Sequence, residues 1–343
     1  MIPTPEPELT HAVDLCTPDG RRLNPAARGW SRHPLHRANL RGRRLRTKKW
    51  DYWAVLTDHL AIGLVYADVG YLGLASVWWG DLRTGATGGA ELVRPLAIGL
   101  ALPDRPGSEA LVVDRPGMQM RLTDSPAGTH LYARWTEDDG TAGELDVMVG
   151  LPEHHESLSV VIPWDDSRFQ FTTKDQARPA SGRLVRRGTE VLVGVDGAAW
   201  GVLDVGRGRW PYSMTWNWGG GAGRTDDGEV VGIQVGARWT EGTGFTENAV
   251  TIDGRLHKIG RELDWSYSWD RPMLPWSVRD PGGAVDLVLT PRLDRHGLTD
   301  AMVLRTEVHQ VFGTWSGTVC DQDGRLLVVD RLPGFAEEAR NRW

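Results

Sequence analysis

The chain has 343 residues, of which 40% are hydrophobic and 24% are charged, a composition that excludes a fibrous or disordered protein. Its 42 Gly and 20 Pro predict many short elements and turns rather than long helices. The 17 Trp outnumber the 5 Phe and 6 Tyr together, so the placement of Trp is the first guide to function.

The chain has a formal net charge of −6, but a segment near its start is strongly basic. Residues 21–49 contain 11 Lys or Arg and no acid, so the rest of the chain sums to −17. We expect residues 1–50 to form a basic strap laid over an acidic body, because runs of like charge are usually solvated or paired within the protein. Alternatively, this segment binds an anionic group of a ligand or nucleic acid. No nucleic-acid-binding signature appears, so we expect no nucleic-acid partner.

The two cysteines, Cys16 and Cys320, provide neither a disulfide framework nor a four-cysteine zinc site. The apolar stretch 60–80 is long enough to span a membrane but contains Asp68 and several glycines. It fits two buried strands and a turn better. The first 30 residues lack the apolar core of a signal peptide. These observations favour a cytoplasmic protein without an integral membrane segment.

Hairpin turns are indicated by Asp-Gly pairs, which suit the positive φ angles of tight type I′ turns. Six pairs occur, at 19–20, 139–140, 196–197, 227–228, 253–254 and 323–324. Apolar residues alternate with polar ones at 210–218, 231–239 and 263–269, as in strands with one buried face. The pattern predicts an all-β protein of about twenty short strands.

Helices are predicted at only two places, a terminal stretch at 334–342 and a short segment after Lys174. Closing into barrels removes the exposed edges that so many antiparallel strands would leave. We place a soft boundary where the strand pattern breaks, which predicts a first barrel half at 51–178 and a second at 179–343.

Several Trp-rich motifs are similar to those of the bacterial domain-of-unknown-function family 2804. They are Leu23-Asn24-Pro25, Gly29-Trp30-Ser31-Arg32, Pro34-Leu35-His36, Lys49-Trp50-Asp51-Tyr52-Trp53, Trp210-Pro211-Tyr212, Trp216-Asn217-Trp218-Gly219, Trp239 through Gly244, Glu247-Asn248, Gly334 through Glu338, and Arg342-Trp343. More distantly, the chain resembles lipocalin-like double barrels such as carotenoid 1,2-hydratases, tocopherol cyclases, pericyclase-type enzymes and ceramide carriers. The resemblance implies two lipocalin-like antiparallel β-barrels in tandem with few short helices. It transfers no catalytic residue to this chain.

Aromatic ladders are the strongest hint of a binding site, because every second side chain of a strand lies on the same face. Indole walls suit a polyene, a sterol or a sugar ring, and their π faces can stabilise a cation. Packing in a barrel core is the alternative. The candidate ligand-binding residues are Trp210, Tyr212, Trp216, Trp218, Trp239, Trp265, Tyr267 and Trp269.

Four titratable residues near the ladders are the catalytic candidates: Glu247, Asp204, Asp270 and His309. A carboxyl group in a Trp-lined pocket should have a raised pKa and act as a general acid. Glu247 is the first choice, since it shares the apolar face of Phe245. Ion pairing at hairpin flanks is the alternative for each acid, and core packing is the alternative for His309.

We therefore expect an enzyme that acts on an apolar small molecule, such as a terpenoid, polyene or polycycle, by acid-assisted hydration, elimination or cyclisation. A lipid or pigment carrier and a glycosidase with paired carboxylates are the alternatives. The chain lacks a P-loop, a dinucleotide-binding glycine pattern and a nucleophile elbow, so we expect no cofactor. His33 with His36, and His154 with His155, are not spaced as metal ligands, so we expect no metal. The oligomeric state stays open.

Overall fold

A computed structural model of the chain describes residues 5–195, 198–301 and 304–342. Over these residues the helices are two short 3₁₀ turns, η1 (Pro25–Ala27) and η2 (Arg44–Arg46). The other regular elements are β-strands. The expectation of an all-β protein with few short helices is confirmed.

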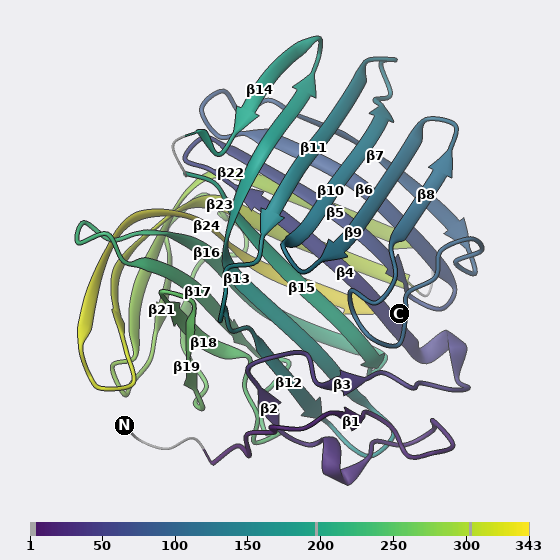
Figure 1. The fold of residues 1–343 in the computed structure, drawn as a ribbon, viewed down its shortest axis with the longest axis vertical. Helices are drawn as coiled ribbons and strands as arrows, with labels where there is room; N and C mark the ends of the chain where they lie inside the picture. Colours follow the sequence, from purple (N-terminus) through teal and green to yellow (C-terminus); the bar gives the residue numbers. More distant parts are fainter. Residues whose placement is uncertain (1–4, 196–197, 302–303, 343) are drawn as a thin grey trace.

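The first and larger sheet has thirteen strands within the described residues. They are β2 (Trp30–Ser31), β4 (Thr47–Leu56), β5 (Leu60–Asp68), β6 (Leu72–Asp81), β7 (Thr87–Pro95), β8 (Leu111–Arg115), β9 (Met118–Ser125), β10 (Gly128–Thr136), β11 (Ala142–Gly150), β12 (Leu158–Pro163), β13 (Phe169–Arg186), β14 (Thr189–Val193) and β15 (Trp200–Arg209). The central path is β7-β6-β5-β4-β15-β13-β11-β10-β9-β8, with β12 and β14 paired to β13 and β2 paired to β12 (Figure 1).

This sheet curls over a core of its own because its strands alternate between two faces. On β4, Trp53 and Val55 pack into that core together with Leu131 and Leu145 from the opposite limb. The other face of β4 carries Tyr52, which packs toward the second sheet. The strands of the first sheet are therefore buried on both faces where they meet the second.

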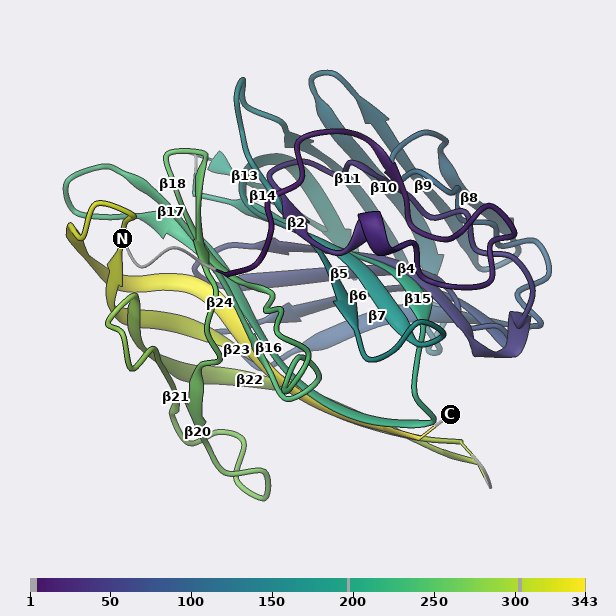
Figure 2. The same ribbon diagram turned by 90° about the horizontal axis from the view of Figure 1, so that it is seen from below.

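The second sheet has nine strands over the described residues. They are β16 (Ser213–Arg224), β17 (Val230–Ala237), β18 (Asn248–Ile252), β19 (Arg255–Ile259), β20 (Asp264–Ser266), β21 (Trp276–Arg279), β22 (Val285–Ala301), β23 (Leu304–Cys320) and β24 (Leu326–Arg342). Their order is β19-β18-β17-β16-β24-β23-β22-β21-β20, and they curl around a second core beside the first sheet (Figure 2). The two curled antiparallel sheets match the expected tandem lipocalin-like barrels.

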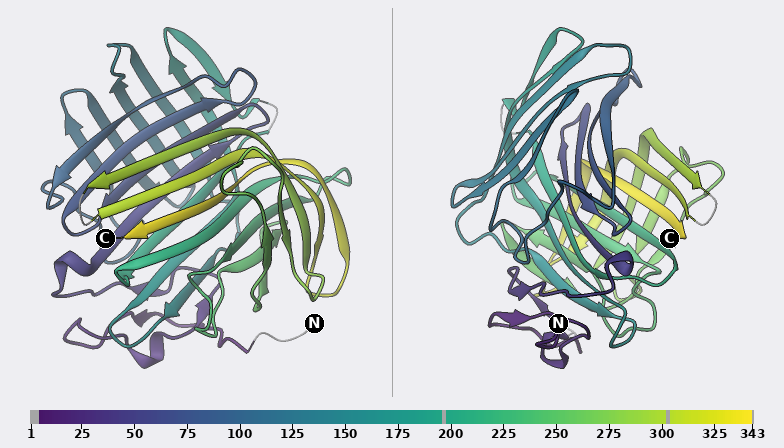
Figure 3. Two further views of the ribbon diagram at one scale, coloured as in Figure 1. Left: turned by 180° about the vertical axis from the view of Figure 1, so that it is seen from behind. Right: turned by 90° about the vertical axis from the view of Figure 1, so that its right-hand side faces the viewer.

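The barrels meet through the outer faces of β4 and β5 on one side and of β16, β23 and β24 on the other. Tyr52 and Ala54 of the first sheet share an apolar cluster with Trp218, Phe312 and Phe335 of the second. In Figure 3 the yellow-green strands of the second sheet lie across the purple and blue strands of the first. The side chains in this contact are almost fully buried, as in a hydrophobic core.

The N-terminal segment lies along one end of the barrels and includes a small parallel pair, β1 (Val13–Asp14) and β3 (His36–Arg37). Several of its arginines form ion pairs inside the protein. Arg32 binds both Glu8 and Glu156, at 2.8 and 2.7 Å. Buried Arg209 donates to three carbonyl groups of this segment and fastens it to β15. The domain limits at 50 and 178 stay predictions.

The hairpin and membrane expectations can be compared directly with the strands. Asp-Gly turns join β10 to β11, β16 to β17, β18 to β19 and β23 to β24, as predicted. The pair at 19–20 lies in a loop, and the pair at 196–197 lies outside the described residues. The stretch 60–80 forms β5, a turn and most of β6, as expected. No helix among the described residues has the length and apolarity needed to cross a membrane.

Both helix predictions are wrong. Residues 334–342 belong to strand β24, which is buried on both faces between the second core and the first barrel. Double burial removes the polar-apolar alternation by which a strand is recognised. The segment after Lys174 continues β13 through a bulge between Asp175 and Arg178, with Ala177 at a φ of 61°. The bulge produced the break in pattern.

Candidate functional site

A cavity of about 370 Å³ lies between the two barrels. The first sheet contributes residues of β4, β5, β13 and β15, and the second contributes residues of β16, β22, β23 and β24. The two halves of the chain therefore share one pocket, a question that the sequence left open. The volume suits a small organic ligand.

Indole rings form much of the wall. Trp50, Trp210, Trp216, Trp218 and Trp239 line the cavity. Trp210 is the centre of the cluster: its ring stacks on Trp239 with centroids 5.4 Å apart and planes 15° apart, and it meets Trp216 edge-on at 5.5 Å. Such mutually packed rings hold a rigid apolar surface at little conformational cost.

Local structure explains why these rings converge. Trp216 and Trp218 lie two residues apart on β16, so they share the face turned to the first barrel. Trp210 directly follows the end of β15, and Trp239 follows the end of β17. Four of the five indoles therefore come from one face of β16 and from the ends of β15 and β17.

A buried charge triad forms one side of the cavity. Lys174 Nζ lies 2.9 Å from Asp204 Oδ1 and 3.2 Å from Glu247 Oε2. Lys174 and Asp204 are direct cross-strand neighbours on β13 and β15. Asp204 also accepts hydrogen bonds from Trp50 Nε1 at 3.0 Å and from Thr172 Oγ1 at 3.1 Å. The positive Lys174 therefore partly neutralises two carboxylates that share a dry site.

Glu247 is seated by the start of β18 and by a gap in its neighbour β17. Gly236 leaves that gap, since a Cβ there would collide with the Glu247 carboxylate. Trp239 Nε1 donates to Glu247 Oε1 at 2.5 Å. Burial raises the pKa of Glu247, opposed by the nearby positive charge of Lys174. The environment thus favours a carboxyl group that binds a proton more readily than an exposed one.

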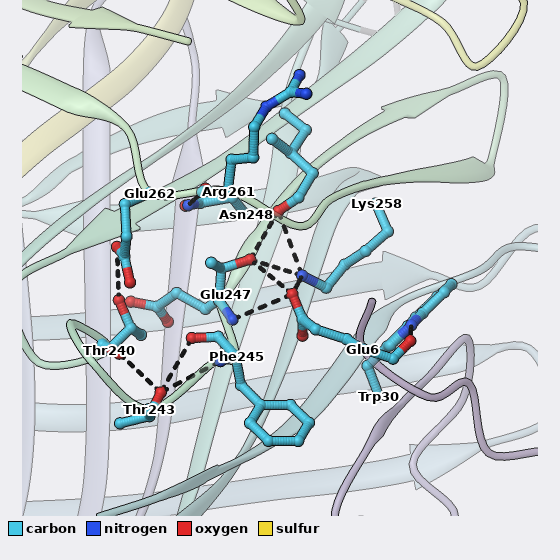
Figure 4. A network of polar contacts seen from close by, with 12 residues as sticks. Glu6, Trp30, Thr240, Thr243, Phe245, Glu247, Asn248, Lys258, Arg261 and Glu262 are labelled. Atoms are coloured by element: carbon cyan, nitrogen blue, oxygen red, sulfur yellow. Dashed lines mark hydrogen bonds and ion pairs between the residues drawn. The ribbon is translucent and has the colours of Figure 1, made fainter. Parts of the chain in front are cut away.

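Thr246, the residue before Glu247, belongs to a polar network that joins β18 and β19 to the N-terminal segment. Figure 4 shows Lys258 and Glu6 meeting in this network. Lys258 Nζ donates to Glu6 at 2.7 Å and to Thr246 Oγ1 at 2.6 Å. Glu6 also accepts from the backbone amide of Thr246. Both charged side chains are almost fully buried. The N-terminal segment therefore helps to fix the backbone that presents Glu247.

A third carboxyl group, that of Glu337 on β24, enters the cavity apart from the triad. Its cross-strand neighbours are Trp218 and Gln310. Trp216 Nε1 donates to Glu337 Oε1 at 2.7 Å. Burial raises the pKa of Glu337 to about 7 from the ordinary value of 4.5. At neutral pH this group is poised to give or take a proton.

The pocket brings together part of the predicted set. Glu247, Asp204, Trp210, Trp216, Trp218 and Trp239 all line it. Tyr212 does not, because it precedes β16 in a turn and is 44% exposed. Asp270 lies in an exposed turn after β20.

The second predicted ladder lies in the second barrel, away from the pocket. Trp265 and Tyr267 pack against the core of the second barrel, and the Tyr267 ring stacks on Trp276 with centroids 4.0 Å apart. Trp269 contacts the ring of His309 edge-on at 4.5 Å. His309 and Trp269 thus form a group of their own.

Sequence reasoning missed Glu337 and Lys174 as site residues. Glu337 fell within the predicted terminal helix, and Lys174 stood at the predicted start of another. One signal could have identified Glu337. It lies in the motif Gly334 through Glu338 that is similar to the family, and a charged residue in such a motif is a candidate site residue.

Comparisons with solved structures show similar folds at low sequence identity. Kievitone hydratase from Nectria haematococca has a TM-score of 0.50 and 10% identity, over 86% of this chain and 88% of that one. A putative AttH from Nitrosomonas europaea has a TM-score of 0.45 and 13% identity, over 87% and 93%. CghA has a TM-score of 0.42 and 11% identity, over 86% and 88%. At 10% identity, the likeness to kievitone hydratase shows the fold alone.

A search of curated protein sequences finds no match. A family model does match, over residues 6–343, and its description is a domain of unknown function, DUF2804. The match spans nearly the whole chain and agrees with the resemblance of the Trp-rich motifs. The chain belongs to the DUF2804 family.

Proposed function

We propose that the protein is an enzyme that adds water to, eliminates water from or cyclises an apolar or polycyclic small molecule in the Trp-lined cavity. The observation that carries the proposal is the buried carboxyl group of Glu337, which accepts a hydrogen bond from Trp216 in an indole-walled cavity between the barrels. Burial raises its pKa to about 7. A carboxyl group in this state transfers protons near neutral pH without a metal or an organic cofactor.

In hydration, the Glu337 carboxyl gives its proton to one carbon of a polarised double bond, and water bonds to the other carbon. The added water then releases a proton, which restores the carboxyl group, so the enzyme is unchanged after one cycle. Elimination is the reverse of these steps. The indole faces favour the positive charge that develops on the substrate carbon, and removal of water from the cavity strengthens that attraction.

The triad of Lys174, Asp204 and Glu247 places fixed charges beside the cavity. Asp204 and Glu247 both bind the same ammonium group, and each accepts a hydrogen bond from an indole N–H. Glu247 is the second candidate acid, because its pKa is also raised. We assign the first role to Glu337, since no cation among the described residues forms an ion pair with it.

A glycosidase is favoured less by this arrangement. A retaining glycosidase holds its two carboxylates about 5 Å apart with the sugar carbon between them. Here Lys174 Nζ occupies the space between Asp204 and Glu247. A carrier would use the same pocket without proton transfer, and the experiment below separates it from an enzyme.

The test begins with organic extraction of the purified protein and identification of the co-purified small molecule by mass spectrometry. That molecule is then incubated with the protein in D₂O, because reversible protonation of carbon exchanges C–H for C–D. We expect deuterium uptake with the wild type and a loss of roughly 100-fold or more with Glu337→Gln. Quenching of Trp emission by the same molecule should persist in the variant.

The matched control is Glu338→Gln. Glu338 is the next residue of β24, is equally enclosed, and faces away from the cavity toward Tyr267 and Arg340. We expect this control to retain exchange. Exchange that survives Glu337→Gln would contradict the assignment, and binding without exchange in the wild type would make the protein a carrier.

A further inference from the structure

A second cluster of chemically active side chains lies beside the pocket, on β22 and β23. His296 and His309 are direct cross-strand partners, and Glu307 lies two residues before His309 on β23. All three therefore share one face of this two-stranded ribbon. The intervening residues Val308 and Gln310 line the pocket from the other face of the ribbon, and the half-exposed His296 borders the pocket as well.

The donor atoms of this cluster converge. One ligand atom from each of the three residues lies within 4.8 Å of the others. His296 Nε2 is 3.4 Å from Glu307 Oε1, and the two imidazole rings lie face to face with centroids 4.3 Å apart. Two ligands about 2.0–2.1 Å from a tetrahedral zinc ion are themselves about 3.4 Å apart. The spacing of His296 and Glu307 already meets that requirement.

A fourth residue orients one imidazole. Asp294 Oδ2 lies 2.7 Å from His309 Nδ1. The carboxylate accepts a hydrogen bond from Nδ1–H, which leaves the lone pair of His309 on Nε2, where it is available to a metal. The other carboxylate oxygen of Asp294 is buried without a hydrogen-bond partner. Carboxylate–histidine pairs of this kind commonly stand behind zinc ligands.

We propose that His296, Glu307 and His309 bind one divalent transition-metal ion of the zinc class, with Asp294 as the positioning residue of His309. Two imidazoles and one carboxylate are a ligand set that zinc accepts, and a water completes four-fold coordination. The side chain of His296 is 44% exposed, so its ring can turn toward the ion and solvent can supply the water.

Neighbouring charges leave the three ligands free to act. Arg305 binds Glu307 through Oε2 at 3.2 Å, which leaves Oε1 on the side of His296. Glu338 lies opposite His309 on β24 but is held by Arg340 at 2.6 Å and by Tyr267. Glu338 is therefore not a fourth ligand, and Glu307 supplies one oxygen only.

Calorimetric titration of the protein with ZnCl₂ tests the proposal, after removal of metal by a chelator and removal of any affinity tag. We expect one equivalent of zinc to bind. His296→Ala and His309→Ala should each weaken binding roughly 100-fold or more, because a ligand is lost. Asp294→Asn should weaken it roughly 10- to 100-fold, the range found for residues that orient zinc-bound histidines. Cobalt(II) should give the visible absorption of a four-coordinate site.

His130→Ala is the matched control. His130 is also a half-exposed strand residue paired with an aspartate, Asp146 at 2.8 Å, but the described residues place no second imidazole against it. Its loss should change zinc affinity less than twofold. His296 is exposed, so its variant keeps the fold, which circular dichroism checks. Absence of binding by the wild type, or one equivalent retained by the His296→Ala/His309→Ala double variant, would overturn the proposal.

Discussion

Two aromatic groups of this protein arise from the same sequence pattern and end in different surroundings. Trp216 and Trp218 alternate on β16 and face a cavity, where Trp216 donates to Glu337. Tyr267 and Trp269 alternate after β20, where Tyr267 packs against the core of the second barrel and donates to Glu338. Trp269 contacts the ring of His309. Alternation decides which side chains share a face. The packing of the two barrels then determines which of these faces borders the cavity.

Glu337 and Glu338 show the same contrast between adjacent residues. Glu338 is bound by Arg340 and Tyr267 and lies 3.6 Å from Arg238. Glu337 accepts a hydrogen bond from one indole, and its pKa is raised by burial. One carboxylate is neutralised by arginines and the other is left to bind a proton. Substitutions at the buried charges and in the two aromatic groups test this contrast.

The largest effect on stability should come from Lys174→Met. Removal of this ammonium group leaves Asp204 and Glu247 buried without a counter-ion, and loss of one partner from a buried ion pair costs roughly 3–5 kcal/mol. Urea unfolding near pH 7 measures the loss. Because burial raises the pKa of Glu247, this acid can take up a proton instead, and the deficit should shrink near pH 5.

Lys49→Met is the control for that change. Its ammonium group lies 3.9 Å from Asp104, whose side chain is partly exposed, and such a pair contributes about 1 kcal/mol or less. Equal losses in the two variants would mean that the Lys174 triad is not the dry, charged site described above.

A smaller effect is expected from Glu337→Gln, and it depends on pH. The pKa of about 7 in the folded protein exceeds the ordinary value of 4.5, so the folded protein retains a proton that the unfolded chain releases between these values. The free energy of unfolding of the wild type therefore falls as pH rises through this window, by up to about 3 kcal/mol. Glutamine removes that contribution.

Denaturant unfolding at several pH values between about 4 and 8 checks this expectation. The stability of Glu337→Gln relative to the wild type should rise across the window, whereas that of Glu338→Gln should not. A flat difference for Glu337→Gln would show that Glu337 titrates at an ordinary value.

The smallest effect concerns ligand binding and compares the two aromatic groups directly. Trp216→Ala removes part of the cavity wall, whereas Trp269→Ala removes a ring of similar partial exposure in the second barrel. With retinol as an apolar probe, we expect a loss of roughly tenfold for Trp216→Ala, about 1.4 kcal/mol. Trp269→Ala should change affinity less than twofold. Similar losses would remove the distinction between the groups.

The sequence predicted the class of fold and six of the residues that line the pocket. Asp-Gly turns and alternation are local signals, so they identified hairpins and the faces of β16 and β17. Asp204 and Glu247 were proposed as acids, and the structure sets them on either side of Lys174. Their meeting depends on strands that come from different sheets, which no local pattern specifies.

The missed residues share a physical cause. Strand β24 is buried on both faces, so its sequence lacks the alternation typical of a strand. The pair Glu337 and Glu338 therefore suggested the charged face of a helix, whereas the two acids lie on opposite faces of a strand. Strand β13 carries four buried polar residues close together at its bulge, Lys174, Asp175, Gln176 and Arg178. Such a run normally marks a loop, and here their partners come from other strands.

The protonation state of Glu337 tests the central claim most directly. Infrared difference spectra between the wild type and Glu337→Gln isolate the carbonyl band of this one carboxyl group. We expect the band of the protonated acid to be present near pH 5 and to disappear with a midpoint near the pKa of about 7. A group already ionised at pH 5 would contradict the proposal that this cavity holds a proton ready for transfer.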